Sequence, residues 1–275
     1  MVAPHRTEVT HLSLLKPICV DNDQFSPDTG CFGNFVLKSY QSAIAISDYT
    51  DHQLSIVGGY LDDCGNSVTA PANLTNCFVK FGGCNNRVVI HHKANLNNVT
   101  LDLPVDNALV EIGENVRMTG NWRIGYDCTL KIGKNSSSTN PVYMTCAEGS
   151  CIIIGEDCMF ATNNQTCTDD AHPIYDVNTD SRINFSKDVK LGNHVWVGYG
   201  ATLLGEATVG DGSVIGAYAL VNKSHPNNCL LVGTPAKTVK HDIFGRDRLY
   251  WSPPKSLNTI PKKNYCKNPI ATTLL

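Results

Sequence analysis

The sequence predicts an all-β protein built as a parallel β-helix of hexapeptide repeats. Three observations support this fold class. Aliphatic residues recur at every sixth position between Leu191 and Val221. The chain of 275 residues contains 22 Gly and 13 Pro and is only 17% charged, a composition that favours strands and turns over helices. The apolar residues in this region follow neither the 3.6-residue period of a helix nor the simple alternation of a strand.

The six-residue repeat is unbroken over the stretch LGNHVW VGYGAT LLGEAT VGDGSV IGAYAL VNKSHP, which begins at Leu191. A period of six is typical of a parallel β-helix in which three short strands make each triangular coil. One aliphatic side chain per side points into the prism, and burying each contributes roughly 1.5–3 kcal/mol. The leading residues are Leu191, Val197, Leu203, Val209, Ile215 and Val221, and small residues follow four positions later at Val195, Ala201, Ala207, Ser213 and Ala219.

Weaker copies of the repeat extend upstream. Ile90, Ile112, Ile132 and Ile154 lie 22, 20 and 22 residues apart, which indicates coils of about eighteen residues with small insertions at the corners. Cys128 and Cys158 fall at the small inward or corner position of these coils, so we expect both to be core thiols.

The repeat divides the chain into three parts. Residues 1–80 show no register and are predicted as an irregular β extension or cap. Residues 81–240 form the β-helix domain, interrupted by a loop over 161–188. Residues 241–275, which include a Pro- and Lys-rich stretch, are predicted as a short closing helix and an extended tail, because a solenoid needs its open end covered.

Composition excludes several classes of function. The net charge of −3 argues against a nucleic-acid-binding protein. The sequence contains no run of 18 apolar residues that could form a transmembrane helix. Its first residues also lack the basic start of a signal peptide. We therefore expect a cytoplasmic protein whose 12 cysteines are reduced, and the absence of any C-x-x-C pair argues against a zinc ribbon or a thioredoxin-type site.

The polar segment TDDAHPIYDVNTDSRIN, residues 168–184, interrupts the regular coils. A loop held by a rigid frame is a common place for functional groups. A histidine titrates near pH 6.5, so His172 is suited to act as a general base at neutral pH. Pro173 restricts its backbone to extended conformations. Three nearby acids are candidates for orienting the imidazole: Asp169, Asp170 and Asp176.

The segments IGEDCMF, DDAHPIYD, KDVKLGNHVWVG, VIGAYALVNKS and LVGTPAKTVK together resemble the hexapeptide-repeat O-acetyltransferases. They are most similar to the enzymes that act on bacterial capsular polysaccharides, polysialic acid O-acetyltransferases among them. The resemblance covers about residues 152–240 strongly and reaches back weakly to about residue 82. It implies a left-handed β-helix, a homotrimer, and transfer of an acetyl group from acetyl-CoA to a hydroxyl of a sugar or polysaccharide.

Carried over to this chain, the resemblance makes His172 the catalytic base and Trp196 part of the acceptor site. Trp196 precedes the inward Val197, so we expect its indole to point outward as a platform for a sugar ring. Tyr175 and Arg182 are candidates either for holding the loop closed or for contacting an acceptor carboxylate. The predicted CoA-binding positions are Gly198, Tyr199, Ala217, Asn222, Lys223, Lys237 and Lys240. Some relatives carry arginine near Lys240, and lysine keeps the charge but loses the bidentate fork.

No nucleophile motif such as G-x-S-x-G occurs, which favours direct transfer in a ternary complex over an acyl-enzyme. We expect no metal. The main alternative is N-acetylation of an amino sugar, since an amine acceptor also needs a base. A zinc-dependent carbonic anhydrase also uses a six-residue β-helix, but it requires three histidine ligands, and His194 is the one residue we could pair with His172. A non-enzymatic scaffold has no reason to combine His172, Trp196 and Lys223.

Overall fold

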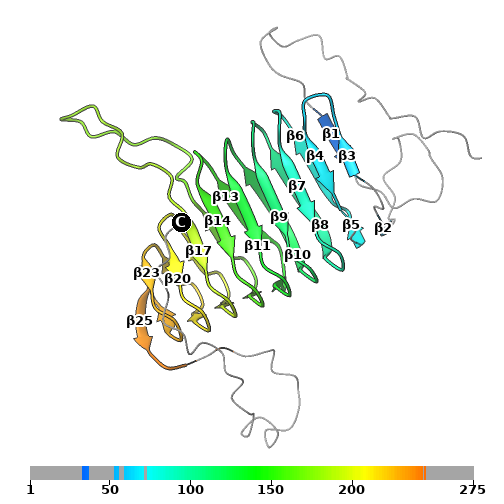
Figure 1. The fold of residues 1–275 in the computed structure, drawn as a ribbon. Helices are drawn as coiled ribbons and strands as arrows, with labels where there is room; N and C mark the ends of the chain where they lie inside the picture. Colours follow the sequence, from blue (N-terminus) through cyan, green and yellow to red (C-terminus); the bar gives the residue numbers. More distant parts are fainter. Residues whose placement is uncertain (1–32, 37–52, 56–58, 71–72, 244, 246–275) are drawn as a thin grey trace, which may run out of the picture.

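The computed structural model describes residues 33–36, 53–55, 59–70, 73–243 and 245, and every regular element within them is a β-strand. The strands form a left-handed parallel β-helix of about seven turns, which confirms the predicted fold class. Figure 1 shows the stacked coils, with one long loop projecting from the body. Within the described residues there is no helix that could cross a membrane.

Each coil contributes one strand to each of three faces. Face 1 contains β5 (Asn73–Thr75), the start of β8 (Asn95–Leu103), the start of β10 (Arg117–Ile124), β12 (Ser137–Ser138), β15 (Met159–Phe160), β18 (Trp196–Val197), β21 (Val214–Ile215) and β24 (Leu230–Val232). Face 2 contains β6 (Phe78–Phe81), the ends of β8 and β10, β13 (Val142–Cys146), β16 (Gln165–Cys167), β19 (Thr202–Leu203) and β22 (Leu220–Val221). Face 3 contains β4 (Ser67–Thr69), β7 (Arg87–Ile90), β9 (Leu109–Ile112), β11 (Thr129–Ile132), β14 (Cys151–Ile154), β17 (Val189–Leu191), β20 (Thr208–Val209) and β23 (Ser224–His225).

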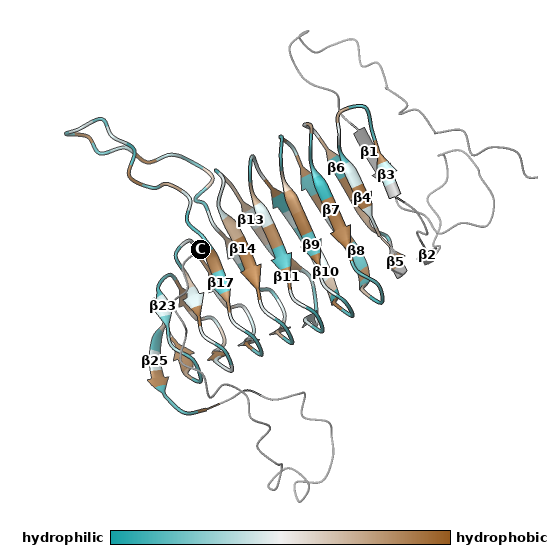
Figure 2. Ribbon diagram, viewed as in Figure 1, coloured by the Kyte–Doolittle hydropathy of each residue, from teal (hydrophilic) through white to brown (hydrophobic). Residues whose placement is uncertain are grey.

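The core is a stack of aliphatic side chains inside the prism. On face 3, Ile90, Ile112, Ile132 and Ile154 lie directly above one another in the register of the parallel strands. All six repeat leaders are buried, the most exposed being Leu191 at 4%, and the small residues that follow them are fully buried. Cys128 and Cys158 are buried free thiols, as predicted. Figure 2 shows this arrangement as hydrophobic colour along the strands and hydrophilic colour at the coil edges.

The corner between faces 3 and 1, which we call corner 3–1, uses the same backbone in successive coils. Its third residue has a positive φ near +60° in every coil from β9 to β24: Asn115, Asn135, Asp157, His194, Gly212 and Asn228. Asn, Asp and Gly tolerate this left-handed conformation best, so His194 is the unusual member of the series. The first residue of the corner is tightly packed, since a β-carbon on Gly192 would lie 2.7 Å from the backbone nitrogen of Asp211.

Both ends of the β-helix differ from the simple repeat. Parallel pairing begins at β4, before residue 81, and three antiparallel strands flank the first coil: β1 (Gly33–Val36), β2 (Gln53–Ser55) and β3 (Gly59–Leu61). At the other end, β25 (Lys237–Lys240) runs antiparallel to β24. The short helix predicted after Lys240 falls mainly on residues 244 and 246–275, outside the described part of the chain.

The position of β16 (Gln165–Cys167) shows that the loop interrupting the coils is shorter than predicted. This strand lies inside the range 161–188 that the sequence analysis treated as loop. The insertion itself comprises residues 168–188, between β16 on face 2 and β17 on face 3. We call it the catalytic loop, because the sequence predicts that His172 within it is the catalytic base, and we call the corner from which it emerges corner 2–3.

Candidate active site

The catalytic loop leaves the β-helix without disturbing the coil register. Ile154 in β14 still pairs with Leu191 in β17, although the loop lies between their coils. The two ends of the loop meet where the Lys187 amide donates to the Thr168 carbonyl at 3.0 Å. Thr168 is 3% exposed, and its hydroxyl accepts from the amide of Ala147 and the hydroxyl of Ser150 in the coil beneath. The loop therefore rests on a buried, hydrogen-bonded base.

Beyond this base the loop doubles back as a hairpin. Tyr175 and Arg182 form an antiparallel bridge, and the Ile183 amide donates to the Ile174 carbonyl at 2.9 Å. Asp176 closes the turn, because its carboxylate accepts from the amides of Asn178 and Thr179. These amide donors hold the pKa of Asp176 below its usual value. The hairpin thus has defined internal bonds despite being exposed.

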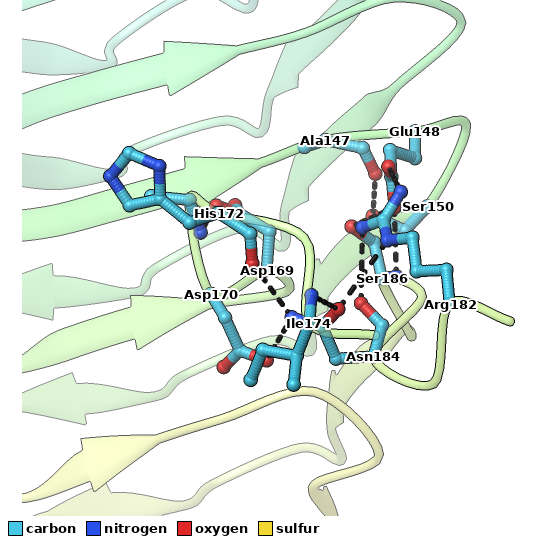
Figure 3. A network of polar contacts seen from close by, with 11 residues as sticks. Ala147, Glu148, Ser150, Asp169, Asp170, His172, Ile174, Arg182, Asn184 and Ser186 are labelled. Carbon is cyan, nitrogen blue, oxygen red and sulfur yellow. Dashed lines mark hydrogen bonds and ion pairs between the residues drawn. The ribbon is translucent and has the colours of Figure 1, made fainter. Parts of the chain in front are cut away.

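Asn184 fixes the backbone around His172 (Figure 3). Its side-chain nitrogen donates to the carbonyl of His172 and to the carboxylate of Asp170, both at 2.9 Å. Its side-chain oxygen accepts from the amide of Ile174 at 2.6 Å. One asparagine on the returning strand therefore holds three residues of the outgoing strand, with His172 at their centre.

Glu148 fastens the returning strand of the loop to the coil below. Its carboxylate forms a bidentate ion pair with Arg182 and also accepts from the amide and the hydroxyl of Ser186. The Arg182 guanidinium, and after it the Ser186 amide, lower the pKa of Glu148 to about 2. Arg182 also lies over the ring of Phe185, 4.9 Å from its centroid. The sequence makes Arg182 a candidate either for holding the loop closed or for contacting an acceptor carboxylate. Its ion pair with Glu148 holds the loop.

The imidazole of His172 points away from this network in Figure 3. Among the described residues, none hydrogen-bonds to the ring, and the side chain is exposed. The three acids considered for orienting the ring bind elsewhere: Asp169 accepts from the Ala171 amide, Asp170 from Asn184, and Asp176 from its own turn. The histidine is thus positioned through its backbone, with both ring nitrogens available to a substrate.

Trp196 lies on the outside of face 1, as predicted, and is 42% exposed. It belongs to an apolar outward column, since β15 and β21 place Met159 and Val214 on either side of it in register. Its inward neighbour Val197 is fully buried. Trp196 therefore lies in the middle of a short apolar column on the outside of face 1.

The predicted CoA-binding residues divide between three places. Gly198, Tyr199 and Ala217 lie together at the corner between faces 1 and 2, where the Tyr218 amide donates to the Tyr199 carbonyl at 2.8 Å. The rings of Tyr199 and Tyr218 meet edge to face, 5.3 Å apart. Asn222 and Lys223 lie at corner 2–3, on the same edge of the prism as the catalytic loop. Lys237 and Lys240 are exposed on β25.

His172 and Trp196 do not meet within one chain. The catalytic loop emerges from corner 2–3, and face 1 is the side of the triangular prism opposite that corner. The hydrophobic core lies between the two residues. The described part of one chain therefore does not bring the predicted base and the predicted acceptor residue together.

The structure provides no support for the alternative based on zinc. His194 is at corner 3–1, where its ring nitrogens are bonded to Asp157 and to the carbonyl of Gly245, while His172 is at corner 2–3. Within the described ranges, no group of three or more His, Cys, Asp or Glu side chains could hold a metal ion.

Three residues that organise the loop were missed by the sequence analysis: Glu148, Asn184 and Ser186. Asn184 stands in the RIN segment that follows the histidine, so its position near the loop's return was a usable signal. Glu148 is far from the loop in sequence, and no local pattern marks it.

Comparison with known proteins gives a consistent result. The family model described as bacterial transferase hexapeptide (six repeats) matches residues 188–223. A polysialic acid O-acetyltransferase of Neisseria meningitidis is 35% identical over 139 residues, which cover 50% of this chain and 63% of that protein. A galactoside O-acetyltransferase of Escherichia coli is 28% identical over 140 residues, covering 51% of this chain and 67% of the relative. The chain thus spans less than two thirds of the length of the Neisseria relative.

Among solved structures, the crystal structure of the polySia-specific acetyltransferase NeuO superposes with a TM-score of 0.61. The two chains are 30% identical, and the match covers 66% of this chain and 85% of that one. The similarity therefore extends over most of the other molecule rather than over the repeat alone.

Proposed function

The chain belongs to the hexapeptide-repeat O-acetyltransferases, and from this membership we propose that it transfers an acetyl group from acetyl-CoA to a hydroxyl group of a sugar or polysaccharide of the bacterial surface. The acceptor class is proposed from the relatives, which are described as acting on polysialic acid and on galactosides. Acetyl-CoA is the acetyl donor and leaves as free CoA.

One observation carries the proposed mechanism: His172 has a backbone fixed by Asn184 and an imidazole that no described residue engages. A general base must be positioned and must also keep a ring nitrogen free to accept a proton. A surface histidine without a role has no need for the bonds that Asn184 makes around it. We assign the base to His172 on this ground.

The reaction balances with His172 as the one proton carrier. A ring nitrogen takes the proton of the acceptor hydroxyl while that oxygen attacks the thioester carbonyl. The carbon–sulfur bond then breaks, and the imidazolium returns the proton to the CoA sulfur. A base of this kind typically contributes about 10²–10⁴-fold in rate. No acyl-enzyme is required, so the two substrates bind together.

Lys223, Lys237 and Lys240 are the residues proposed to bind the CoA phosphates. All three side chains are exposed and cationic on a chain whose net charge is −3. A lysine ammonium binds phosphate groups through charge-assisted hydrogen bonds. The exposed edge formed by Tyr199 and Tyr218 borders the same end of the β-helix and offers an apolar contact for the pantetheine arm.

The separation of His172 from Trp196 supports a site shared between subunits, and a homotrimer is the arrangement we infer from the family. The catalytic loop carries the apolar side chains such a contact would cover. Five of them are exposed by half or more: Ile174, Tyr175, Val177, Ile183 and Phe185, with Val177 at 90%. Exposed apolar groups of this number on one hairpin indicate an interaction surface.

The first experiment is a mass-spectrometric screen of glycans incubated with acetyl-CoA and the purified chain. The panel contains polysialic acid, galactosides and amino sugars. Wild-type protein is compared with His172→Ala and with His92→Ala, a control at an exposed histidine on another corner. We expect an ester product whose formation falls at least 100-fold in His172→Ala and is unchanged in His92→Ala. Product only on amine groups would show N-acetylation in place of the proposed O-acetylation. Full activity of His172→Ala would contradict the assignment of His172 as the base.

Subunit sharing is tested by mixing two impaired variants, His172→Ala and Trp196→Ala, after dissociation and reassembly. If each site takes His172 from one subunit and Trp196 from its neighbour, mixed assemblies contain some intact sites and regain part of the activity. Activity that stays at the level of the separate variants would contradict a shared site. Light scattering on the same samples gives the number of subunits.

A further inference from the structure

The segment that follows β25 runs along corner 3–1, and its Gly245 lies beside Trp196 on face 1. We define the C-terminal strap as residues 241–243 and 245. The Ile243 amide donates to the Asn228 carbonyl at 2.9 Å, and the Asn228 side chain donates back to the Ile243 carbonyl at 3.1 Å. Gly245 is buried. A β-carbon there would lie 3.0 Å from Cγ2 of Val214 and 3.3 Å from Cβ of Trp196, so the strap packs directly against the indole's base.

The strap is held at two positions of one corner. Asn228 and His194 both belong to the left-handed series of corner 3–1, two coils apart, and they hold Ile243 and Gly245 respectively. Between them the series has Gly212, which has no side chain to block the strap. Elsewhere in the series the residue is Asn or Asp, whose short side chains bond along the corner, as Asn115 does to Asn135. At position 194 a longer side chain reaches out to the strap instead.

Both ring nitrogens of His194 have partners. Nδ1 is 2.8 Å from a carboxylate oxygen of Asp157, and Nε2 is 2.7 Å from the Gly245 carbonyl oxygen. A carbonyl oxygen can only accept a hydrogen bond, so Nε2 is the donor to Gly245. The side chain is 7% exposed, so water cannot easily replace a lost partner. His194 therefore joins the coil that carries Asp157 to the strap.

We propose that His194, bonded to both Asp157 and Gly245, is a positioning residue that clamps the C-terminal strap against Trp196 and makes the strap one wall of the acceptor site. Removing the imidazole releases the strap and loosens the wall. The acceptor half of this proposal depends on the function proposed above, whereas the clamp itself does not.

The test uses the full chain with His194→Asn, which installs the residue type that the same corner carries in three other coils and so preserves the backbone. Asparagine is too short to reach Gly245. The matched control is His92→Asn, which removes an exposed histidine paired with Glu114 and distant from the strap. A second variant, Gly245→Ala, disturbs the strap by packing and leaves His194 intact.

Hydrogen exchange of the Ile243 amide measures the clamp without any substrate. We expect it to speed up about tenfold in His194→Asn and in Gly245→Ala, and not in His92→Asn. Equal exchange in wild type and His194→Asn would overturn the clamp.

Steady-state kinetics with polysialic acid as the acceptor probe test whether the strap contributes to acceptor binding. In His194→Asn we expect the acceptor KM to rise threefold or more, while kcat and the KM for acetyl-CoA stay within twofold. A loosened strap with an unchanged acceptor KM would overturn the assignment to the acceptor site. If wild-type protein acetylates no glycan of the screen, both the proposed function and the assignment of the strap to the acceptor site are contradicted. The exchange of the Ile243 amide still tests whether His194 holds the strap.

Discussion

Glu148 and Arg182 join the catalytic loop to the coil beneath it through a bidentate ion pair. The two residues are 34 positions apart in sequence. Arg182 lies on the returning strand of the loop, two residues before Asn184. Because Asn184 holds the backbone of His172, the ion pair indirectly fixes the proposed base. This relationship leads to a first prediction.

Arg182→Lys should lower kcat about tenfold and leave the melting temperature nearly unchanged. Lysine keeps the charge but supplies one bonding group in place of the planar fork, so the loop loses its bidentate anchor. The coils themselves are not touched by the substitution. Steady-state kinetics and thermal melting measure the two effects. Lys187→Arg, at the exposed pair with Glu206, serves as a control near the loop base. Unchanged kcat in Arg182→Lys would separate the ion pair from catalysis.

The pH dependence of this anchor follows from the lowered pKa of Glu148. The carboxyl group titrates at about 2 in the folded protein, against 4.5 for the free group. A lowered carboxyl pKa means that the pair stabilises the loop fully above about pH 4.5 and loses this contribution as the pH falls toward 2. We expect hydrogen exchange in the loop to be the same at pH 5 and pH 7 once corrected for intrinsic rates. In Glu148→Gln the loop should exchange faster at both pH values.

Trp196→Ala should raise the acceptor KM about tenfold or more and change stability little. The indole is 42% exposed on the outside of the prism, so its removal leaves no cavity in the core. An aromatic platform contributes binding energy to a sugar ring through contact with its apolar face. Acceptor titrations of the variant and of Met159→Ala, the neighbour in the same column, make the comparison. Acceptor kinetics equal to wild type in Trp196→Ala would exclude the platform.

Ile132→Ala should destabilise the β-helix by about 2–5 kcal/mol, as large-to-small substitutions in well-packed cores do. Ile132 is 2% exposed and lies between Ile112 and Ile154 in the face 3 stack. The outward neighbour Lys131, which pairs with Glu111 on the surface, provides the control Lys131→Ala. Chemical denaturation followed by circular dichroism measures both variants. A loss below 1 kcal/mol for Ile132→Ala would show that the stack is not a stabilising core.

His225 should make the last coil sensitive to acid. Burial lowers the pKa of its imidazole below 6.5, and its Nδ1 lies 3.2 Å from the hydroxyl of Thr238 on β25. The folded state therefore binds the proton less readily than the unfolded state. Stability is complete above about pH 7 and declines as the pH falls below 6.5. We expect the melting temperature of His225→Gln to depend less on pH between 5 and 7.5 than that of the wild type. His91→Gln, at an exposed histidine, is the control.

The repeat could be predicted from sequence because each of its residues reports on its own environment. Inward positions such as Ile112 and Val209 must be aliphatic, and corner positions such as Gly192 must be small, whatever the remainder of the chain does. The same reasoning correctly placed Trp196 on the outside. The assignment of the base to His172 comes from a local motif in a loop that breaks the pattern, and it stays a prediction.

The supporting contacts could not be predicted, because they join residues that no local period relates. Glu148 meets Ser186 across 38 positions, and His194 meets Gly245 across 51. His194 looked like a possible metal ligand in the sequence, and its true partners come from the neighbouring coil and from the C-terminal segment. The extent of the loop was overestimated for a related reason: β16 is too short and too polar to stand out, and only its pairing with β13 and β19 identifies it.

The continuous pairing of Ile154 with Leu191 makes the junction at Thr168 and Lys187 a point at which loops can be exchanged. A foreign hairpin that begins and ends at this junction would add chemistry without altering the stacking of the coils on either side. Substrate range in proteins of this architecture can therefore diversify by replacing the inserted segment, while the solenoid that carries it is inherited unchanged.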